Sequence, residues 1–164
     1  YANKLTNASK VGIGQDSHKF TDKKKPLIVG TVKISEKNGF EADSDGDVIM
    51  HALFNALSTA IGDKSLGFYA DDMCKRGITD SKKYVEFILD KVNEKGFKIS
   101  NVAVMLEGKK PRIDEYIDKI KASLSKLLKI KKENIGIAAT SGEELTEFGK
   151  GRGMQCFAVV TLKS

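Results

Sequence analysis

The chain has 164 residues, of which 40% are hydrophobic and 30% charged, so its length and composition suit one globular domain. It shows neither a signal peptide nor the run of about 18 apolar residues that a membrane-spanning helix needs, and we expect no membrane partner. The net charge of +6 permits an anionic partner, but the lysines are scattered and no RNA-binding motif or zinc finger occurs, so we expect no nucleic acid either.

No repeat, low-complexity block or linker divides the sequence, and we interpret residues 1–164 as a single domain. Residues 1–10 are expected to be a flexible or added end, because they are mostly polar and do not begin with methionine. The two cysteines, Cys74 and Cys156, lack CxxC spacing and are interpreted as free thiols.

The first elements that the sequence predicts are strands. Val11–His18 alternates enough to be a strand, and its residues Gly12 and Gly14 allow another backbone to approach closely. Leu27–Gly30 and Val32–Ile34 are typical of a short strand pair around a Gly-Thr turn.

Two helices are predicted next. Apolar residues at helical spacing indicate a helix over Asp47–Ile61, whose N-terminus Asp45 or Asp47 can cap. A second helix is predicted over Asp80–Lys95, and Gly96 ends it.

The rest of the chain returns to strands around one more helix. Asn101–Leu106 is predicted to be a strand, and Ile113–Leu128 an amphipathic helix. Asn134–Thr140 and Met154–Leu162 are predicted strands, separated by the glycine-rich loop Gly142–Gly153.

This order of elements predicts an α+β fold with one mixed or antiparallel sheet and helices on one face. Helices on one face leave the other face of the sheet without cover. An oligomer that packs sheet against sheet would supply that cover.

The chain has only two histidines, and each has acidic neighbours. Residues i and i+2 of a strand share a face, so Asp16 and His18 are expected to point the same way. A carboxylate and an imidazole on one face suit zinc, manganese or iron. From these residues alone, a surface Asp-x-His pair without a metal remains an alternative.

The second histidine, His51, follows a turn with three acids in five residues, Asp43, Asp45 and Asp47. Such a dense acidic turn repels itself unless cations or backbone donors offset the charge. A calcium loop is one alternative, but the glycine of this turn falls at position 4 instead of 6, and position 12 is Phe54 instead of Glu. A histidine tolerated on a helix is the other alternative.

Three motifs occur in order along the chain: Gly14-x-Asp16-x-His18; Ser44-Asp45-Gly46-Asp47-Val48-x-x-His51; and Thr140-Ser141-Gly142-Glu143, followed by Gly149-Lys150-Gly151-x-Gly153. Together they resemble the 2-C-methyl-D-erythritol 2,4-cyclodiphosphate synthase family. The resemblance extends from Val11 to Leu162, and its second motif is highly specific.

The resemblance implies a homotrimer with sheets packed around its axis and active sites between subunits. It implies cyclisation of 4-diphosphocytidyl-2-C-methyl-D-erythritol 2-phosphate with release of CMP, in the non-mevalonate isoprenoid pathway. Zn²⁺ or another divalent transition metal would be held by Asp16, His18 and His51, and Mg²⁺ or Mn²⁺ would bridge phosphates and meet Glu143. The implied location is the bacterial cytoplasm, or a plastid-type organelle if a transit peptide has been removed.

The resemblance also assigns roles to other positions. Asp43 and Ser141 correspond to catalytic residues. The substrate-binding positions are Ser44, Asp63, Lys64, Ser65, Phe68, Asp72, Gly108, Lys110, Arg112, Ile113, Ala139, Thr140, Ser141, Glu143, Phe148, Lys150 and Arg152.

Some of these positions depart from the family pattern. Asp43 stands where relatives commonly have histidine, and an aspartate near phosphates is repulsive unless a cation or proton intervenes. We expect Asp43 to face a cation, the methylerythritol hydroxyls or a basic neighbour. The arginine of the family's glycine-rich loop is either replaced by Lys150 or displaced to Arg152, and the sequence does not choose between them.

Three other functions remain to be tested against this one. A relative that binds metal without turnover would release no CMP. A nucleic-acid-binding module would bind generic DNA with an affinity that falls as salt rises. An unrelated metal-dependent phosphohydrolase would release inorganic phosphate.

Overall fold

The computed structural model describes residues 7–164, and its centre is a four-stranded sheet in the order β1-β6-β4-β5. The strands are β1 (Ser9–Lys19), β4 (Lys98–Glu107), β5 (Ile135–Thr140) and β6 (Gly153–Lys163). β6 runs antiparallel to both β1 and β4, whereas β4 and β5 are parallel. The expected α+β fold with a mixed sheet is therefore confirmed. Ser9 and Lys10, which we expected to lie in a flexible end, belong to β1, and residues 1–6 lie outside the described part.

The predicted strand pair forms a second sheet of its own, so the expectation of one sheet is wrong. It consists of β2 (Leu27–Val29) and β3 (Val32–Ser35), joined by the turn Gly30-Thr31. The backbone N–H groups of Gly30 and Thr31 donate to the Asp47 carboxylate at 2.8 and 2.7 Å. The pair is thus anchored to the start of the following helix.

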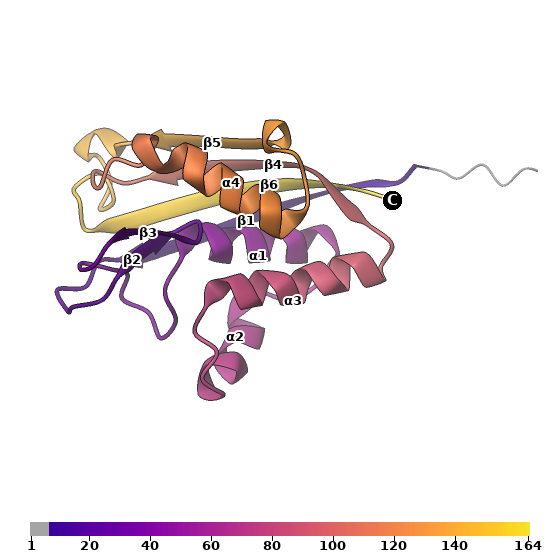
Figure 1. Cartoon of the computed structure of the whole chain (residues 1–164), viewed down its shortest axis with the longest axis horizontal. Helices are drawn as coiled ribbons and strands as arrows, with labels where there is room; N and C mark the ends of the chain where they lie inside the picture. Colours follow the sequence, from indigo (N-terminus) through magenta and orange to yellow (C-terminus); the bar gives the residue numbers. More distant parts are fainter. Residues whose placement is uncertain (1–6) are drawn as a thin grey trace, which may run out of the picture.

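Four α-helices gather on one side of the four-stranded sheet (Figure 1). They are α1 (Val48–Ala60), α2 (Leu66–Lys75), α3 (Ser81–Glu94) and α4 (Ile117–Leu128). The sequence analysis missed α2, a helix in which only Leu66 and Met73 of the ten residues are buried. In residues 7–164, no helix is long and apolar enough to cross a membrane.

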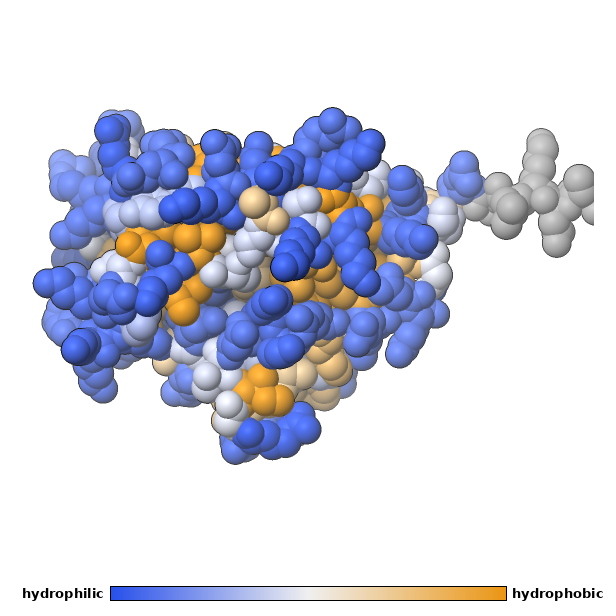
Figure 2. Space-filling model, viewed as in Figure 1, coloured by the Kyte–Doolittle hydropathy of each residue, from blue (hydrophilic) through white to orange (hydrophobic). Residues whose placement is uncertain are grey.

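The two faces of the sheet differ in their surroundings. Alternate side chains of β4 and β6, such as Leu106 and Val160, are fully buried beneath the helices. On the other face Val11 and Ile13 are 68% and 60% exposed, and Phe157 is also exposed. The outer side of the helices, in contrast, presents mainly hydrophilic side chains, with apolar ones in strips between the elements (Figure 2). The sheet therefore has one covered face and one apolar face open to solvent, as the order of elements indicated.

Candidate active site

Two glycines let α1 lie directly on β1. A Cβ atom on Gly12 would stand 1.8 Å from the carbonyl oxygen of Ala56, and one on Gly14 would stand 2.0 Å from that of Ala52. Any side chain at either glycine would thus push the helix away from the strand. The next residues on this face of the strand lie beneath the first turn of the helix.

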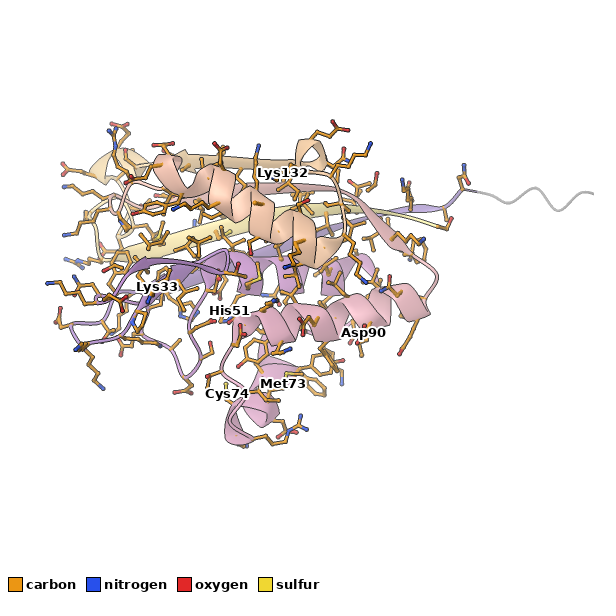
Figure 3. All side chains as sticks on the ribbon, viewed as in Figure 1. Lys33, His51, Met73, Cys74, Asp90 and Lys132 are labelled. Atoms are coloured by element: carbon orange, nitrogen blue, oxygen red, sulfur yellow. The ribbon has the colours of Figure 1, made fainter. Side chains whose placement is uncertain are left out.

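Those residues are Asp16 and His18, and the helix places His51 over them. The Oδ2 atom of Asp16 lies 3.0 Å from Nε2 of His18 and 3.1 Å from Nδ1 of His51, and the two ring nitrogens are 3.2 Å apart. The expected common face of Asp16 and His18 is therefore confirmed. Figure 3 shows His51 beside the beginning of α3.

This triangle of atoms has the size of a tetrahedral metal site. Zinc bound at about 2.0–2.1 Å to nitrogen and oxygen separates its ligand atoms by about 3.3 Å in a tetrahedron. The three observed distances, 3.0 to 3.2 Å, approach that value. One carboxylate and two imidazoles also leave a fourth position open, as in catalytic zinc sites. Asp16, His18 and His51 thus form a candidate metal site.

The electrostatics of this cluster favour charge on Asp16 and His18. Burial opposes ionisation of Asp16, but hydrogen bonds and charges from His18 and His51 outweigh it and lower the pKa of the carboxyl. Burial likewise opposes protonation of His18, yet the contact with Asp16 and a backbone hydrogen bond with Glu41 raise its pKa. A cation at this position would replace the proton that the cluster attracts.

The acidic turn before α1 is neutralised largely by backbone donors. Asp47 is fully buried and caps the helix, because its Oδ1 accepts from the N–H groups of Ile49 and Met50 at 3.1 and 3.2 Å. Its two oxygens also accept from the turn between β2 and β3. Burial and the nearby charge of Asp45 raise the pKa of Asp47 to about 6, whereas these N–H bonds act in the opposite direction.

Lys25 is the basic neighbour of Asp43. Its Nζ atom donates to the carbonyl oxygens of Ala42 at 2.8 Å and Ser44 at 2.6 Å, on either side of the exposed Asp43. Burial lowers the pKa of Lys25, and the charges of Asp45 and Asp43 oppose that effect. Of the three surroundings we expected for Asp43, the structure contains the basic one.

Hydrogen bonds connect the loop before α2 to α3, and to β1 through Asn55 of α1. The carboxylate of Asp63 accepts from Lys91 at 2.6 Å and from the Tyr69 hydroxyl at 2.5 Å, and these two contacts lower its pKa to about 2. The side chain of Asn55 accepts from the N–H of Leu66 and donates to the carbonyl of Gln15, the residue before Asp16. The segment with Asp63, Lys64, Ser65, Phe68 and Asp72 is thereby tied to the strand that carries the metal cluster.

Ser44 lies in the acidic turn beside His51, whereas the other predicted substrate residues follow the ends of β4 and β5 or lie in the loop before β6. The N–H of Gly108 donates to the carbonyl of Thr140 at 3.0 Å, and that of Lys109 to the carbonyl of Phe148 at 3.1 Å. Ser141 accepts from the N–H of Glu143 at 3.4 Å. The predicted residues in this region are Gly108, Lys110, Arg112, Ile113, Ala139, Thr140, Ser141, Glu143, Phe148, Lys150 and Arg152, of which Ile113 is buried in the core. Thr140, Ser141 and Glu143, at the end of β5, form the Ser141 cluster.

Lys150 and Arg152 both pair with the same acid, so the choice between them stays open. The Nζ atom of Lys150 lies 3.4 Å from Oε1 of Glu147, and the guanidinium of Arg152 donates to Oε2 of the same residue. These contacts do not show which of the two cations takes the role of the family's loop arginine.

One chain does not bring the two clusters together. In the sheet register, Asp16 lies opposite Cys156, which lies opposite Leu106, which in turn pairs with Ala139. Three strand spacings of about 4.8 Å put Asp16 and Ala139 about 14 Å apart, on opposite edges of the sheet. The metal cluster and the Ser141 cluster therefore share an end of the sheet without meeting in one chain, whereas the carbonyl of Arg152, at the other end of the glycine-rich loop, accepts from the N–H of Phe20 beside β1.

The sequence analysis missed three residues that shape this site: Lys25, Ser81 and Lys91. Their contacts with the acidic turn, His51 and Asp63 span from 17 to 36 residues of sequence. In the sequence, Ser81 resembles any first residue of a helix, and the two lysines resemble the other lysines of a lysine-rich surface. No local spacing could have pointed to them.

The sequence model of the YgbB family matches residues 9–163. The chain belongs to the YgbB family. Among curated proteins, the 2-C-methyl-D-erythritol 2,4-cyclodiphosphate synthase of Chlamydia muridarum is 40% identical over 156 residues, which are 93% of this chain and 87% of that protein. The counterpart in Chlamydia caviae is also 40% identical over 156 residues, 93% of this chain and 88% of that protein.

Solved structures of YgbB-family proteins have the same fold. A 2C-methyl-D-erythritol-2,4-cyclodiphosphate synthase in a CDP-bound form is 28% identical, with a TM-score of 0.84 over 93% of this chain and 99% of the other. The bifunctional IspDF of Campylobacter jejuni is 29% identical, with a TM-score of 0.89. The match covers 96% of this chain but only 43% of that longer protein.

Proposed function

We propose that this protein is a lyase, a 2-C-methyl-D-erythritol 2,4-cyclodiphosphate synthase of the non-mevalonate isoprenoid pathway. It would convert 4-diphosphocytidyl-2-C-methyl-D-erythritol 2-phosphate into the cyclic diphosphate and CMP. The observation that carries the proposal is the triangle of Asp16, His18 and His51, in a chain 40% identical to synthases of that name. The bacterial origin of those relatives favours the bacterial cytoplasm as its location.

The reaction requires the substrate to be folded back on itself, so that its 2-phosphate reaches the β-phosphorus and CMP leaves. Positioning and charge neutralisation accomplish most of such a phosphoryl transfer. Asp16, His18 and His51 would hold Zn²⁺, and Glu143 would meet Mg²⁺ or Mn²⁺ at the phosphates. Such ions polarise phosphate oxygens and neutralise developing charge.

The chain's own side chains can supply the remaining contacts. The hydroxyl of Ser141 can donate to a phosphate oxygen, and the guanidinium of Arg112 offers two parallel donors to the same kind of group. Lys25 beside Asp43 reduces the repulsion that an aspartate would otherwise exert on phosphates. CDP in a related solved structure supports the cytidine part of the proposed substrate.

The active site would be completed by a neighbouring subunit of a homotrimer. Two observations support this: the separation of the metal cluster from the Ser141 cluster, and the exposed apolar face of the sheet. A trimer that buries this face would bring the Ser141 cluster of one subunit toward the metal cluster of the next.

Replacing Phe157 with aspartate is expected to dissociate the trimer, because a charge would then have to be buried between sheets. Analytical ultracentrifugation should give about three chains per particle for the unmodified protein and a monomer for the variant. Lys119→Asp on the outer side of α4 is the matched control and should leave the mass unchanged. An unmodified protein that sediments as a monomer would contradict the trimer.

The activity is tested by incubating the purified protein with the diphosphocytidyl substrate, Zn²⁺ and Mg²⁺. Phosphorus NMR should show CMP and the cyclic diphosphate appearing in equal amounts. Inorganic phosphate instead of the cyclic product would indicate a phosphohydrolase. Metal binding without any CMP would indicate a relative that has lost turnover, and either result would reject the proposed reaction.

A further inference from the structure

Behind His51, on the side away from Asp16, lies a buried serine. Ser81 is the first residue of α3 and is fully buried. Its Oγ atom lies 2.7 Å from Nε2 of His51, and its hydroxyl also contacts Oδ1 of Asp45. The other carboxylate oxygen of Asp45 accepts from the backbone N–H of Ser81 at 3.0 Å. The acidic turn, α1 and α3 meet at this serine.

The donors and acceptors in this chain of contacts can be assigned in one way. A carboxylate only accepts, so the hydroxyl proton of Ser81 points to Asp45. The Ser81 oxygen is then free to accept, and the proton between it and His51 sits on Nε2 of the imidazole. In the neutral ring this leaves the lone pair on Nδ1, the atom 3.1 Å from Asp16 and 3.2 Å from His18.

We propose that Ser81, held by Asp45, is a positioning residue of the metal centre that fixes His51 in its Nε2–H form with Nδ1 aimed at the metal. The inference rests on the metal site of the proposed function and extends it beyond the three ligands. Histidines that bind metals usually donate their second ring N–H to a partner, and loss of that partner typically weakens metal binding 10- to 100-fold.

The contact with Ser44 does not replace this role. The Oγ atom of Ser44 is 3.4 Å from Nε2 of His51, against 2.7 Å for Ser81. Ser44 also accepts from the N–H of Gly46 at 3.1 Å. The shorter contact, to a serine that is itself bonded to a carboxylate, therefore determines which ring nitrogen of His51 carries the proton.

The first test measures zinc affinity of the full chain by competition with a chromogenic chelator at fixed pH. Ser81→Ala is expected to weaken zinc binding by about 10- to 100-fold. Ser125→Ala is the matched control, because it removes a serine hydroxyl of α4 that donates to the carbonyl of Ile130, beyond the end of that helix. Ser125→Ala should change zinc affinity by less than twofold. Equal affinities for Ser81→Ala and the unmodified protein would overturn the inference.

The second test reads the ring of His51 directly. Because the chain has only two histidines, ¹⁵N-histidine NMR of the zinc-loaded protein resolves both rings. We expect a proton on Nε2 of His51 that exchanges slowly with water, and much faster exchange in Ser81→Ala. A proton found on Nδ1, or exchange unaffected by the substitution, would overturn the inference even if zinc affinity falls.

Two further variants separate positioning from folding. Ser81→Thr keeps the hydroxyl and should restore most of the affinity that Ser81→Ala loses. Should Ser81→Ala fail to fold, Asp45→Asn serves instead, since it removes the carboxylate that orients the hydroxyl and should also weaken zinc binding. An unmodified protein that binds no zinc would reject the metal site itself, whereas unchanged binding in these variants would reject only the role of Ser81.

Discussion

Asp16→Ala is expected to abolish stoichiometric zinc binding and to lower kcat by about a thousandfold. Its Oδ2 atom is the corner of the triangle nearest to both histidines, at 3.0 and 3.1 Å. Without it two imidazoles remain, fewer than the three protein ligands typical of a catalytic zinc site. Metal stabilisation of phosphate charge is worth several kcal/mol, and about 4 kcal/mol corresponds to about a thousandfold in rate.

Elemental analysis and the CMP assay together measure this result. The unmodified protein should contain about one zinc per chain, and the variant almost none. Asp90→Ala is the matched control, because it removes an exposed carboxylate from α3 away from His51 (Figure 3). It should retain both zinc and turnover. A variant of Asp16 that keeps its zinc and its kcat would remove the basis of the proposed mechanism.

The part of the site that could be predicted from sequence is the part that follows local periodicity. Asp16 and His18 share a strand face because strands repeat every two residues, and Gly12 and Gly14 indicated the close approach of another backbone, which is that of α1. The family motifs then added His51. Secondary structure was predictable for the same reason wherever apolar residues repeat, and it failed at α2, which buries few of them.

Long-range contacts account for what sequence could not predict. β2 and β3 form the predicted pair, but the pair is a sheet of its own, and Asp47 accepts from the N–H groups of its turn. Lys25 reaches the carbonyls beside Asp43, and Ser81 reaches His51 from another helix. These contacts depend on how the elements pack against one another, so they cannot be predicted from the spacing of residue types along the sequence.

The packing around the acidic turn explains how the chain tolerates aspartate at position 43, where relatives commonly have histidine. A lysine that donates to two carbonyls of the acidic turn holds its charge within reach of Asp43 and Asp45. The turn can then carry an aspartate at the edge of the proposed phosphate site, because the charge of Lys25 reduces the repulsion between that aspartate and a phosphate. The same turn supplies Asp45 to Ser81 and Asp47 to α1, so two of its three acids have partners inside the fold.

Asp47→Ala is expected to lower the free energy of unfolding by about 4 kcal/mol, the largest stability effect in this region. The helix would lose its cap, which costs about 1 kcal/mol. The N–H groups of Gly30 and Thr31 would lose a buried acceptor, at about 1–3 kcal/mol each. Urea denaturation of the metal-free protein measures the change without a contribution from zinc binding.

Asp80→Ala provides a comparison in which only a helix cap is lost. Asp80 caps α3 and accepts from a single backbone N–H, that of Lys82, at an exposed position. Its removal should cost only about 1 kcal/mol, the ordinary value of a cap. If Asp47→Ala costs no more than Asp80→Ala, its contacts with the turn between β2 and β3 contribute nothing measurable. A difference of several kcal/mol would instead show that one buried carboxylate joins the small sheet to the helix that carries His51.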